Sequence, residues 1–233
     1  MARPPADTNE AFLREVDENL RRDQAEQFFK KNAPLIFGAV LLLLAAIAGF
    51  LYWQNRQAEA AARDSESLVA AMEALGNRQQ GAAARLDPLL DSSSQGIAAQ
   101  AALSKAAALL MKGDKSGAIK LYKSLAEDDG QGQPVRDLAT IRMTALEFDT
   151  LEPAAVISRL EPLAKPDSAW FGSAGEMTGM ALIKQNKNQE AGRLFAAIAA
   201  SKTVPVSIRS RAVQIAGTLG VDASDALPDL TRG

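Results

Sequence analysis

The strongest constraint on this chain is an uncharged run from Asn32 to Asn55, whose centre, residues 34–53, is almost wholly apolar. A helix of that length spans roughly 30 Å, which matches the hydrocarbon thickness of a bilayer. The centre ends on Tyr52-Trp53, where interfacial aromatic side chains usually sit. The run therefore predicts one transmembrane helix over residues 33–53.

Two other interpretations of this run are weaker. A cleaved signal peptide needs a short basic start and an apolar stretch of about 7–15 residues, but here a polar segment of more than thirty residues comes first and the apolar run is longer. The triplet Ala58-Glu59-Ala60 resembles a cleavage site only weakly. A buried core helix needs a polar face, whereas Leu41–Leu44 and their neighbours are apolar on every face.

Basic residues close to the span predict its orientation. Five lie on the N-terminal side and two on the C-terminal side; they are Arg14, Arg21, Arg22, Lys30, Lys31 and, after the span, Arg56 and Arg63. Acidic residues contribute little to this rule. We expect a bacterial inner-membrane protein with its N-terminus in the cytoplasm and its C-terminal domain in the periplasm.

Residues 1–32 predict a cytoplasmic amphipathic helix. Asp7 and Glu10 have the spacing of a capping box, with Asp7 at the N-cap, and apolar residues recur at helical spacing behind them. This helix either lies on the bilayer surface or docks a partner. At the start of the span, Pro34 suits the first turn of a helix, where its missing N–H costs nothing.

Small residues share one face of the predicted span. Ala45, Ala48, Gly49 and Tyr52 follow one another at spacings of three or four residues, opposite a leucine-rich surface. Small side chains let another membrane helix approach closely, so this face is a candidate packing surface for a membrane partner. The alternative is that alanine is simply abundant in this chain.

The chain contains no cysteine and no histidine, which excludes thiolate nucleophiles, imidazole bases and Cys/His zinc or iron–sulfur sites. The tight acidic groups outside the N-terminal helix are Asp128-Asp129 and Asp222 with Asp225, in a predicted loop and tail. We therefore expect no enzyme activity, no metal and no cofactor. A net charge of -2 gives no basic field for nucleic acid.

A repeat of about 36 residues follows the span. Four segments carry a small or apolar residue with bulky residues four and seven positions later: Ala82/Leu86/Leu89, Ala118/Tyr122/Leu125, Val156/Leu160/Leu163 and Ala191/Phe195/Ile198. Twelve positions before these segments lie the small residues Ala70, Ala106, Thr144 and Gly179. The pattern predicts antiparallel helix pairs in which the small residue allows close approach.

Turn residues keep the same register. Asn77, Gly113 and Asn186 each precede a second helix by five residues, and Gly and Asn tolerate the left-handed conformation that ends a helix. The remaining unit has Leu151 there, with Pro153 at a plausible helix start. Two similar stretches, Arg85–Leu89 and Arg159–Leu163, each contain a proline. At that proline the helix should kink, or its regular hydrogen bonding should end.

These units resemble the tetratricopeptide repeat, with Ala191 and Phe195 matching its second helix best. The resemblance implies an all-α fold: one N-terminal transmembrane helix, then a divergent tetratricopeptide-like α-solenoid of about four helix pairs plus a capping helix opened by Pro205. We expect the repeat domain at residues 54–221 and a C-terminal tail at 222–233.

The order of parts resembles a family of ancillary subunits of the bacterial Sec translocon, in the form found in alphaproteobacteria. The stretch Glu15–Asp23 (Glu-Val-Asp-Glu-Asn-Leu-Arg-Arg-Asp) and the span after it carry this resemblance. It implies a scaffold that binds Sec translocon subunits and passes emerging secreted polypeptides to periplasmic chaperones. An envelope or cell-division coordinator built on similar repeats remains the alternative.

Solenoid arrays present a concave surface lined by the first helix of each unit, here expected at 97–112, 134–148 and 169–184. Candidate partner-binding residues on these helices are four charged and four apolar side chains: Lys105, Arg142, Glu176, Lys184, Trp170, Phe171, Met177 and Met180. For each of them the alternative is an ordinary core or solvated position.

Overall fold

The computed structural model describes residues 8–226; before residue 30 it describes side chains for only Val16, Arg21, Arg22 and Glu26. All regular structure in residues 8–226 is helical, so the predicted all-α fold is confirmed. The chain divides into two compact units, Met1–Glu59 and Ala60–Gly233, and each is considered by itself.

The first unit consists of most of helix α1, Thr8–Gly76. The N-cap expected at Asp7 lies outside the described residues. Pro34 lies inside α1 and not in a first turn, because the helix already begins at Thr8. Within the described residues, one stretch, Lys30–Gly76, is long and apolar enough to cross a membrane, with a mean hydropathy of 2.6 over its most apolar window. That window is 0% buried, which argues against a soluble core helix.

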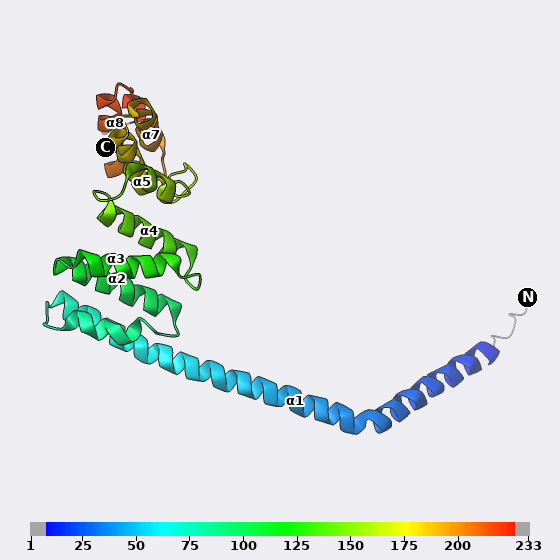
Figure 1. Cartoon of the computed structure of the whole chain (residues 1–233). Helices are drawn as coiled ribbons and strands as arrows, with labels where there is room; N and C mark the ends of the chain where they lie inside the picture. The colour runs from blue at the N-terminus through cyan, green and yellow to red at the C-terminus, as the bar shows by residue number, and fades with distance from the viewer. Residues whose placement is uncertain (1–7, 227–233) are drawn as a thin grey trace, which may run out of the picture. The chain divides into compact units, whose positions relative to one another are not determined.

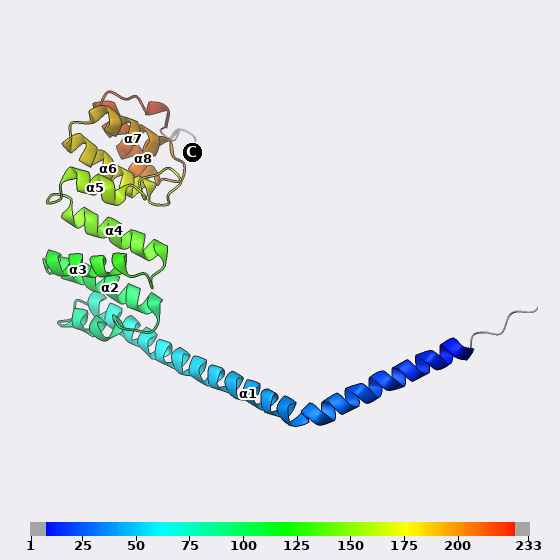
Figure 2. The same cartoon turned by 45° about the vertical axis from the view of Figure 1, so that its right-hand side comes forward.

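The second unit is a stack of helix pairs that follow one another in chain order (Figure 1). The end of α1 pairs with a 3-10 helix, η1 (Ala82–Leu89). Three α-helical pairs follow: α2 (Gln95–Met111) with α3 (Lys115–Glu127), α4 (Gln133–Glu147) with α5 (Pro153–Leu160), and α6 (Phe171–Lys184) with α7 (Asn188–Ala200). Helix α8 (Val206–Thr218) packs on α6 and α7, so the predicted solenoid of four pairs and a cap is confirmed (Figure 2).

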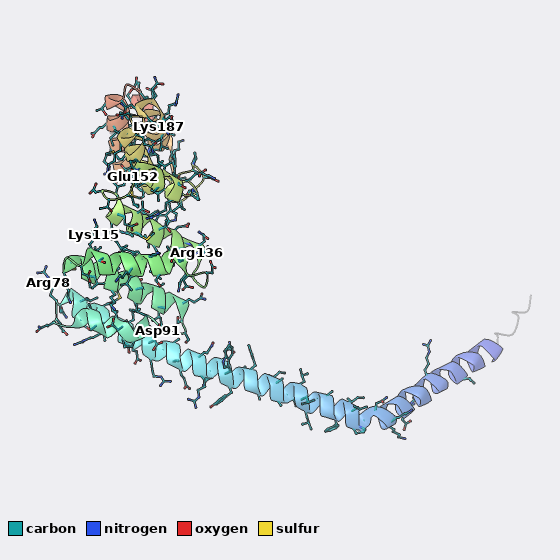
Figure 3. The ribbon with its side chains drawn as sticks, viewed as in Figure 1. Arg78, Asp91, Lys115, Arg136, Glu152 and Lys187 are labelled. Carbon is teal, nitrogen blue, oxygen red and sulfur yellow. The ribbon has the colours of Figure 1, made fainter. Side chains whose placement is uncertain are left out.

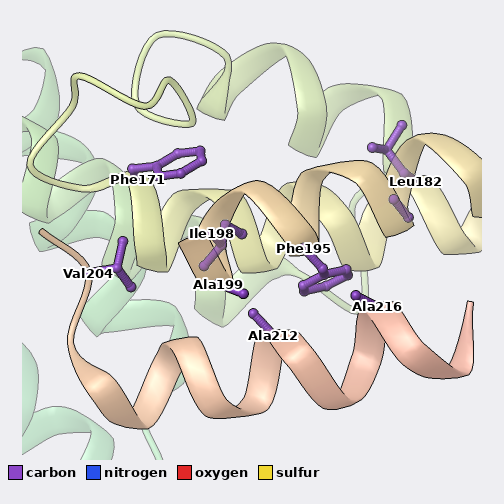
Figure 4. Packing of buried hydrophobic residues seen from close by; sticks show 9 residues of the cluster. Phe171, Leu182, Phe195, Ile198, Ala199, Val204, Ala212 and Ala216 are labelled. Atoms are coloured by element: carbon purple, nitrogen blue, oxygen red, sulfur yellow. The ribbon is translucent and has the colours of Figure 1, made fainter. Parts of the chain in front are cut away.

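The core lies between the helices of each pair and between neighbouring pairs. All twelve residues that the repeat pattern places on the second helices are buried, none of them more than 8% exposed. In the last pair, Phe195 and Ile198 of α7 point into the layer that α6 and α8 enclose (Figure 4). Burial of these apolar side chains holds the stack together.

The predicted turns are confirmed in two units and shifted in the first. Gly113 and Asn186 take the left-handed conformation, with φ of 80° and 60°. In the first unit Arg78, with φ 52°, takes it in place of Asn77. The small buried residue there is correspondingly Ala71 and not Ala70, which is exposed.

Proline explains the two irregular second helices. Pro88 has no N–H to donate, and η1 is a 3-10 helix in place of the expected α-helix. The helix α5 ends at Leu160, two residues before Pro162. Both outcomes fit the predicted loss of regular hydrogen bonding at this register.

The expected tail begins with a docked segment. The side chain of Arg209 donates hydrogen bonds to the carbonyl oxygens of Ala199 (2.8 Å) and Ala226 (2.6 Å). Ala223 and Ala226 pack against the last core cluster. Residues 222–226 therefore belong to the folded unit; residues 227–233 lie outside the described part of the chain.

Candidate protein-binding surface

The first helices of the last units and the capping helix enclose a hollow of about 440 Å³, here called the C-terminal hollow. It is lined by Ala145, Phe148, Asp149, Glu176, Met177, Met180, Phe195, Arg211 and Ile215. These residues come from α4 and the turn directly after it, and from α6, α7 and α8. Three of the predicted candidates, Glu176, Met177 and Met180, thus lie together.

The repeat period explains why these side chains meet. Glu176 of α6 and Arg211 of α8 are 35 residues apart, and so are Met180 and Ile215. Residues one period apart occupy equivalent places on successive first helices. The capping helix therefore continues the surface as a further first helix.

A two-bond ion pair closes one side of the C-terminal hollow. Nε and Nη2 of Arg211 donate to the two carboxylate oxygens of Glu176, each at 2.6 Å. The hydrogen bond to Glu176, and then its negative charge, raise the pKa of Arg211 above its usual value. The guanidinium thus stays charged, and the planar fork fixes α8 against α6.

A cation covers the neighbouring edge of the hollow. Nζ of Lys184 lies 4.4 Å from the centroid of the Phe148 ring, donates to the Phe148 carbonyl oxygen at 3.4 Å and lies 3.7 Å from Oδ1 of Asp149. Lys184 was a predicted candidate and is exposed. Its aliphatic stem and its charge therefore sit at the rim of an apolar cavity.

Two charged candidates lie outside the C-terminal hollow. Arg142 is exposed on α4, three residues before the lining residue Ala145 and thus on the same helical face. Lys105 of α2 forms an ion pair with Asp87 of η1, at the contact between the first two units. Arg142 extends the surface, whereas Lys105 joins neighbouring repeats.

The two aromatic candidates are also separated from the hollow. Phe171 is 1% exposed and belongs to the last core cluster, so a partner cannot touch it in this fold. Its place on the binding surface is corrected: it is a core residue. Trp170 is half-buried and lines a different hollow of about 600 Å³, together with Pro134 and Lys165.

Sequence reasoning missed Phe148, Arg211 and Ile215 as lining residues. The sequence pattern predicts the helix of Arg211 and Ile215 only as a cap of the stack, so it does not predict them as lining residues. The 35-residue spacing from α6 was the signal that could have found them. Phe148 directly follows the last residue of α4, where nothing in the local pattern distinguishes a lining residue from a core residue.

The predicted packing face of the apolar segment is uncovered in the first unit. Ala45, Ala48, Gly49 and Tyr52 are exposed, and a Cβ atom on Gly49 would meet nothing within 4 Å. Nε of Arg56 donates to the Tyr52 hydroxyl at 3.1 Å. The guanidinium of Arg56 also lies 5.5 Å from the centre of the Tyr52 ring, so Arg56 makes two contacts with the last residue of this face.

Within the described residues, no group of three or more acidic side chains is placed to hold a metal ion. The C-terminal hollow offers methionine and aromatic side chains below ion pairs that already satisfy each other. Such a cavity suits the apolar side chain of a partner.

A family model described as a tetratricopeptide repeat-like domain matches residues 26–215. The match covers most of the chain and includes the apolar segment as well as the repeats. Domains of this type are typically non-catalytic scaffolds for interactions between proteins. No curated protein and no solved structure was found to match the chain.

Proposed function

Because the chain belongs to the tetratricopeptide repeat-like family, we propose that it is a membrane-tethered adaptor that binds other proteins and catalyses no reaction. The observation that carries this proposal is the C-terminal hollow, an apolar cavity that successive first helices line at one repeat period. A solenoid uses such a surface to hold a polypeptide along several repeats.

The tether is the apolar part of α1. Its side chains are exposed from Leu35 to Trp53 apart from Gly38, which is half-exposed. So long an apolar surface is unfavourable in water and favourable in lipid. Five basic residues before the span against two after it support an N-terminus in the cytoplasm and therefore a repeat domain in the periplasm.

The proposed partners are subunits of the Sec translocon, together with periplasmic chaperones or polypeptides that emerge from the translocon. The resemblance of residues 15–23 and the span to the ancillary translocon subunits supports this choice. The exposed small-residue face at Ala45, Ala48, Gly49 and Tyr52 supports a membrane-embedded partner.

Crosslinking in living cells tests this function. The full-length chain is crosslinked in its native membrane, purified under denaturing conditions, and its adducts are identified by mass spectrometry. Translocon subunits and chaperones are the expected products. Enrichment of peptidoglycan-synthesis enzymes in their place would contradict the export role and favour a coordinator of envelope assembly.

A further inference from the structure

A second hollow, here called the N-terminal hollow, lies at the other end of the repeat stack and measures about 650 Å³. Its lining comes from the end of α1, the turn after it, η1 and the C-terminal half of α2: Met72, Leu75, Gly76, Arg78, Gln79, Ala82, Ala83, Ser104, Ala107, Ala108, Met111 and Lys112. None of these residues lines the C-terminal hollow.

The two hollows occupy equivalent places in the repeat. Ser104 and Ala107 precede Ala118, the first pattern residue of their unit, by 14 and 11 residues. Met177 and Met180 precede Ala191 by the same distances. The N-terminal hollow therefore lies on the same face of the first helices as the C-terminal hollow.

Two of the residues that line the N-terminal hollow are solvent-exposed methionines. Met111 is 78% exposed and Met72 is 44% exposed, on two different helices. An exposed methionine gains nothing for the fold, and its unbranched thioether adapts to apolar side chains of different shapes. These walls fit an apolar side chain supplied by another molecule.

The rim of the N-terminal hollow is basic. Arg78 and Lys112 both line it, and within the described residues no acidic side chain does. Neither cation forms an ion pair in this part of the chain. In the C-terminal hollow, by contrast, Arg211 and Lys184 face Glu176 and Asp149.

The backbone conformation of Arg78 also supports a binding role for the N-terminal hollow. Figure 3 labels Arg78, which lies in the turn two residues after the end of α1. Its backbone takes the left-handed conformation, with φ 52°. This conformation favours Gly or Asn, and Gly76 and Asn77 directly precede Arg78 in the sequence. The chain thus holds an arginine at a disfavoured turn position beside an apolar cavity, and such outliers gather at functional sites.

We propose that the N-terminal hollow binds a polypeptide segment in which an apolar side chain is flanked by carboxylates. The apolar side chain packs between Met72 and Met111, and the carboxylates meet Arg78 and Lys112. A concave cavity between helices suits a side chain, whereas a flat bilayer surface could not enter it. This inference goes beyond the proposed function because it concerns a separate surface and the chemistry of what that surface binds.

The test measures peptide binding to the full-length chain in phosphatidylcholine nanodiscs. Fluorescent peptides of the form Asp-Asp-Leu-Leu-Asp-Asp and Lys-Lys-Leu-Leu-Lys-Lys are titrated and followed by anisotropy at low and high salt. We expect the acidic peptide to bind more tightly than the basic one and to lose affinity as salt rises.

Three variants locate the site. Arg78→Asn with Lys112→Gln should weaken the acidic peptide roughly tenfold and flatten its salt dependence. Arg78→Asn by itself should leave the unfolding midpoint unchanged or higher, because Asn tolerates the turn better; a purely structural role for Arg78 predicts no loss of binding. Met111→Gln should weaken the peptide at all salt concentrations. The matched controls, Val206→Gln and Lys187→Gln, are at exposed positions outside both hollows and should leave peptide binding unchanged.

Several results would overturn the inference. One is equal binding of the two peptides, or binding of neither; another is affinity that the double variant leaves unchanged. A third is Arg78- and Lys112-dependent binding of phosphatidylglycerol vesicles that displaces the peptide, which would reassign the hollow to lipid. None of these results touches the crosslinking test of the proposed function, which reports partners in the cell.

Discussion

Gly179 of α6 lies directly against the ring of Phe195 of α7: a Cβ atom on Gly179 would be 2.6 Å from Cε2 of that ring. Phe195 is 0% exposed and Gly179 is buried. The absence of a side chain at Gly179 is therefore what allows the two helices of the last pair to approach with Phe195 between them. The repeat pattern predicts a small residue at this place, twelve residues before Ala191, and close approach of the paired helices there; the contact with the Phe195 ring is seen only in the structure.

Gly179→Leu should lower the free energy of unfolding by about 2 kcal/mol or more, because the added atoms have no room beside Phe195. Denaturant unfolding of the full chain in detergent, followed by circular dichroism, measures the change. The control is Gly217→Ala in α8, where an added Cβ meets nothing within 4 Å. There the better helix propensity of Ala should raise stability, by up to about 1 kcal/mol. Equal effects at the two sites would contradict the packing account.

Ala191→Arg should destabilise the last pair by about 3 kcal/mol or more. Ala191 is 0% exposed, so the guanidinium would be buried without a partner or would force α7 away from its neighbours. The same unfolding measurement checks this. Ala197→Arg, on the exposed side of α7, should change stability by less than about 0.5 kcal/mol. A comparable loss at Ala197 would show that Arg is harmful anywhere on the helix.

Much of the fold follows from the sequence because the same hydrophobic pattern recurs in each of the four repeat units. The pattern places the core residues of all four second helices correctly, and the expected first helices 97–112, 134–148 and 169–184 match α2, α4 and α6 to within two residues. The first unit departs by one residue at Arg78, where Gly81 adds a second left-handed turn. Local turn geometry of that kind is not encoded in hydrophobic spacing.

The surface is less predictable than the fold. Helical spacing puts Phe171 and Met180, nine residues apart, on opposite faces of α6, but it does not tell which face is buried; in the fold Met180 is 41% exposed and Phe171 is buried. Which face of α6 stays open depends on where α8 packs, and this tertiary contact has no local signature. The ion pair of Arg211 with Glu176, 35 residues away, could be anticipated only by extending the repeat period through the cap.

The N-terminus should lie in the cytoplasm, because more basic residues precede the span than follow it. The repeat domain should then lie on the opposite side of the membrane. A periplasm-active phosphatase fused after Gly233 should be active, and a reporter that fluoresces only in the cytoplasm, fused at the same place, should be dark. Phosphatase silence with bright fluorescence would reverse the topology.

The apolar segment should also help to recognise the membrane partner. Gly49→Leu should reduce co-purification of that partner, because the larger side chain blocks close helix approach, while insertion and protein level stay unchanged. Quantitative immunoblots of membrane fractions and of the purified complex measure both. Leu43→Ala, on the opposite, leucine-rich side of the helix, is the control and should have no effect. If a polyleucine segment in place of residues 34–53 preserves the complex fully, the span is only an anchor.

The most direct test of protein binding by the repeat surface is crosslinking from single positions in the cell. A photo-reactive amino acid at Met180, inside the C-terminal hollow, is compared with the same group at Lys120, which is exposed on the second helix α3. The adaptor account predicts discrete protein adducts from Met180 and few or none from Lys120, and it predicts that Met177→Gln reduces those adducts. No adducts from Met180, or the same adducts at equal yield from Lys120, would contradict it.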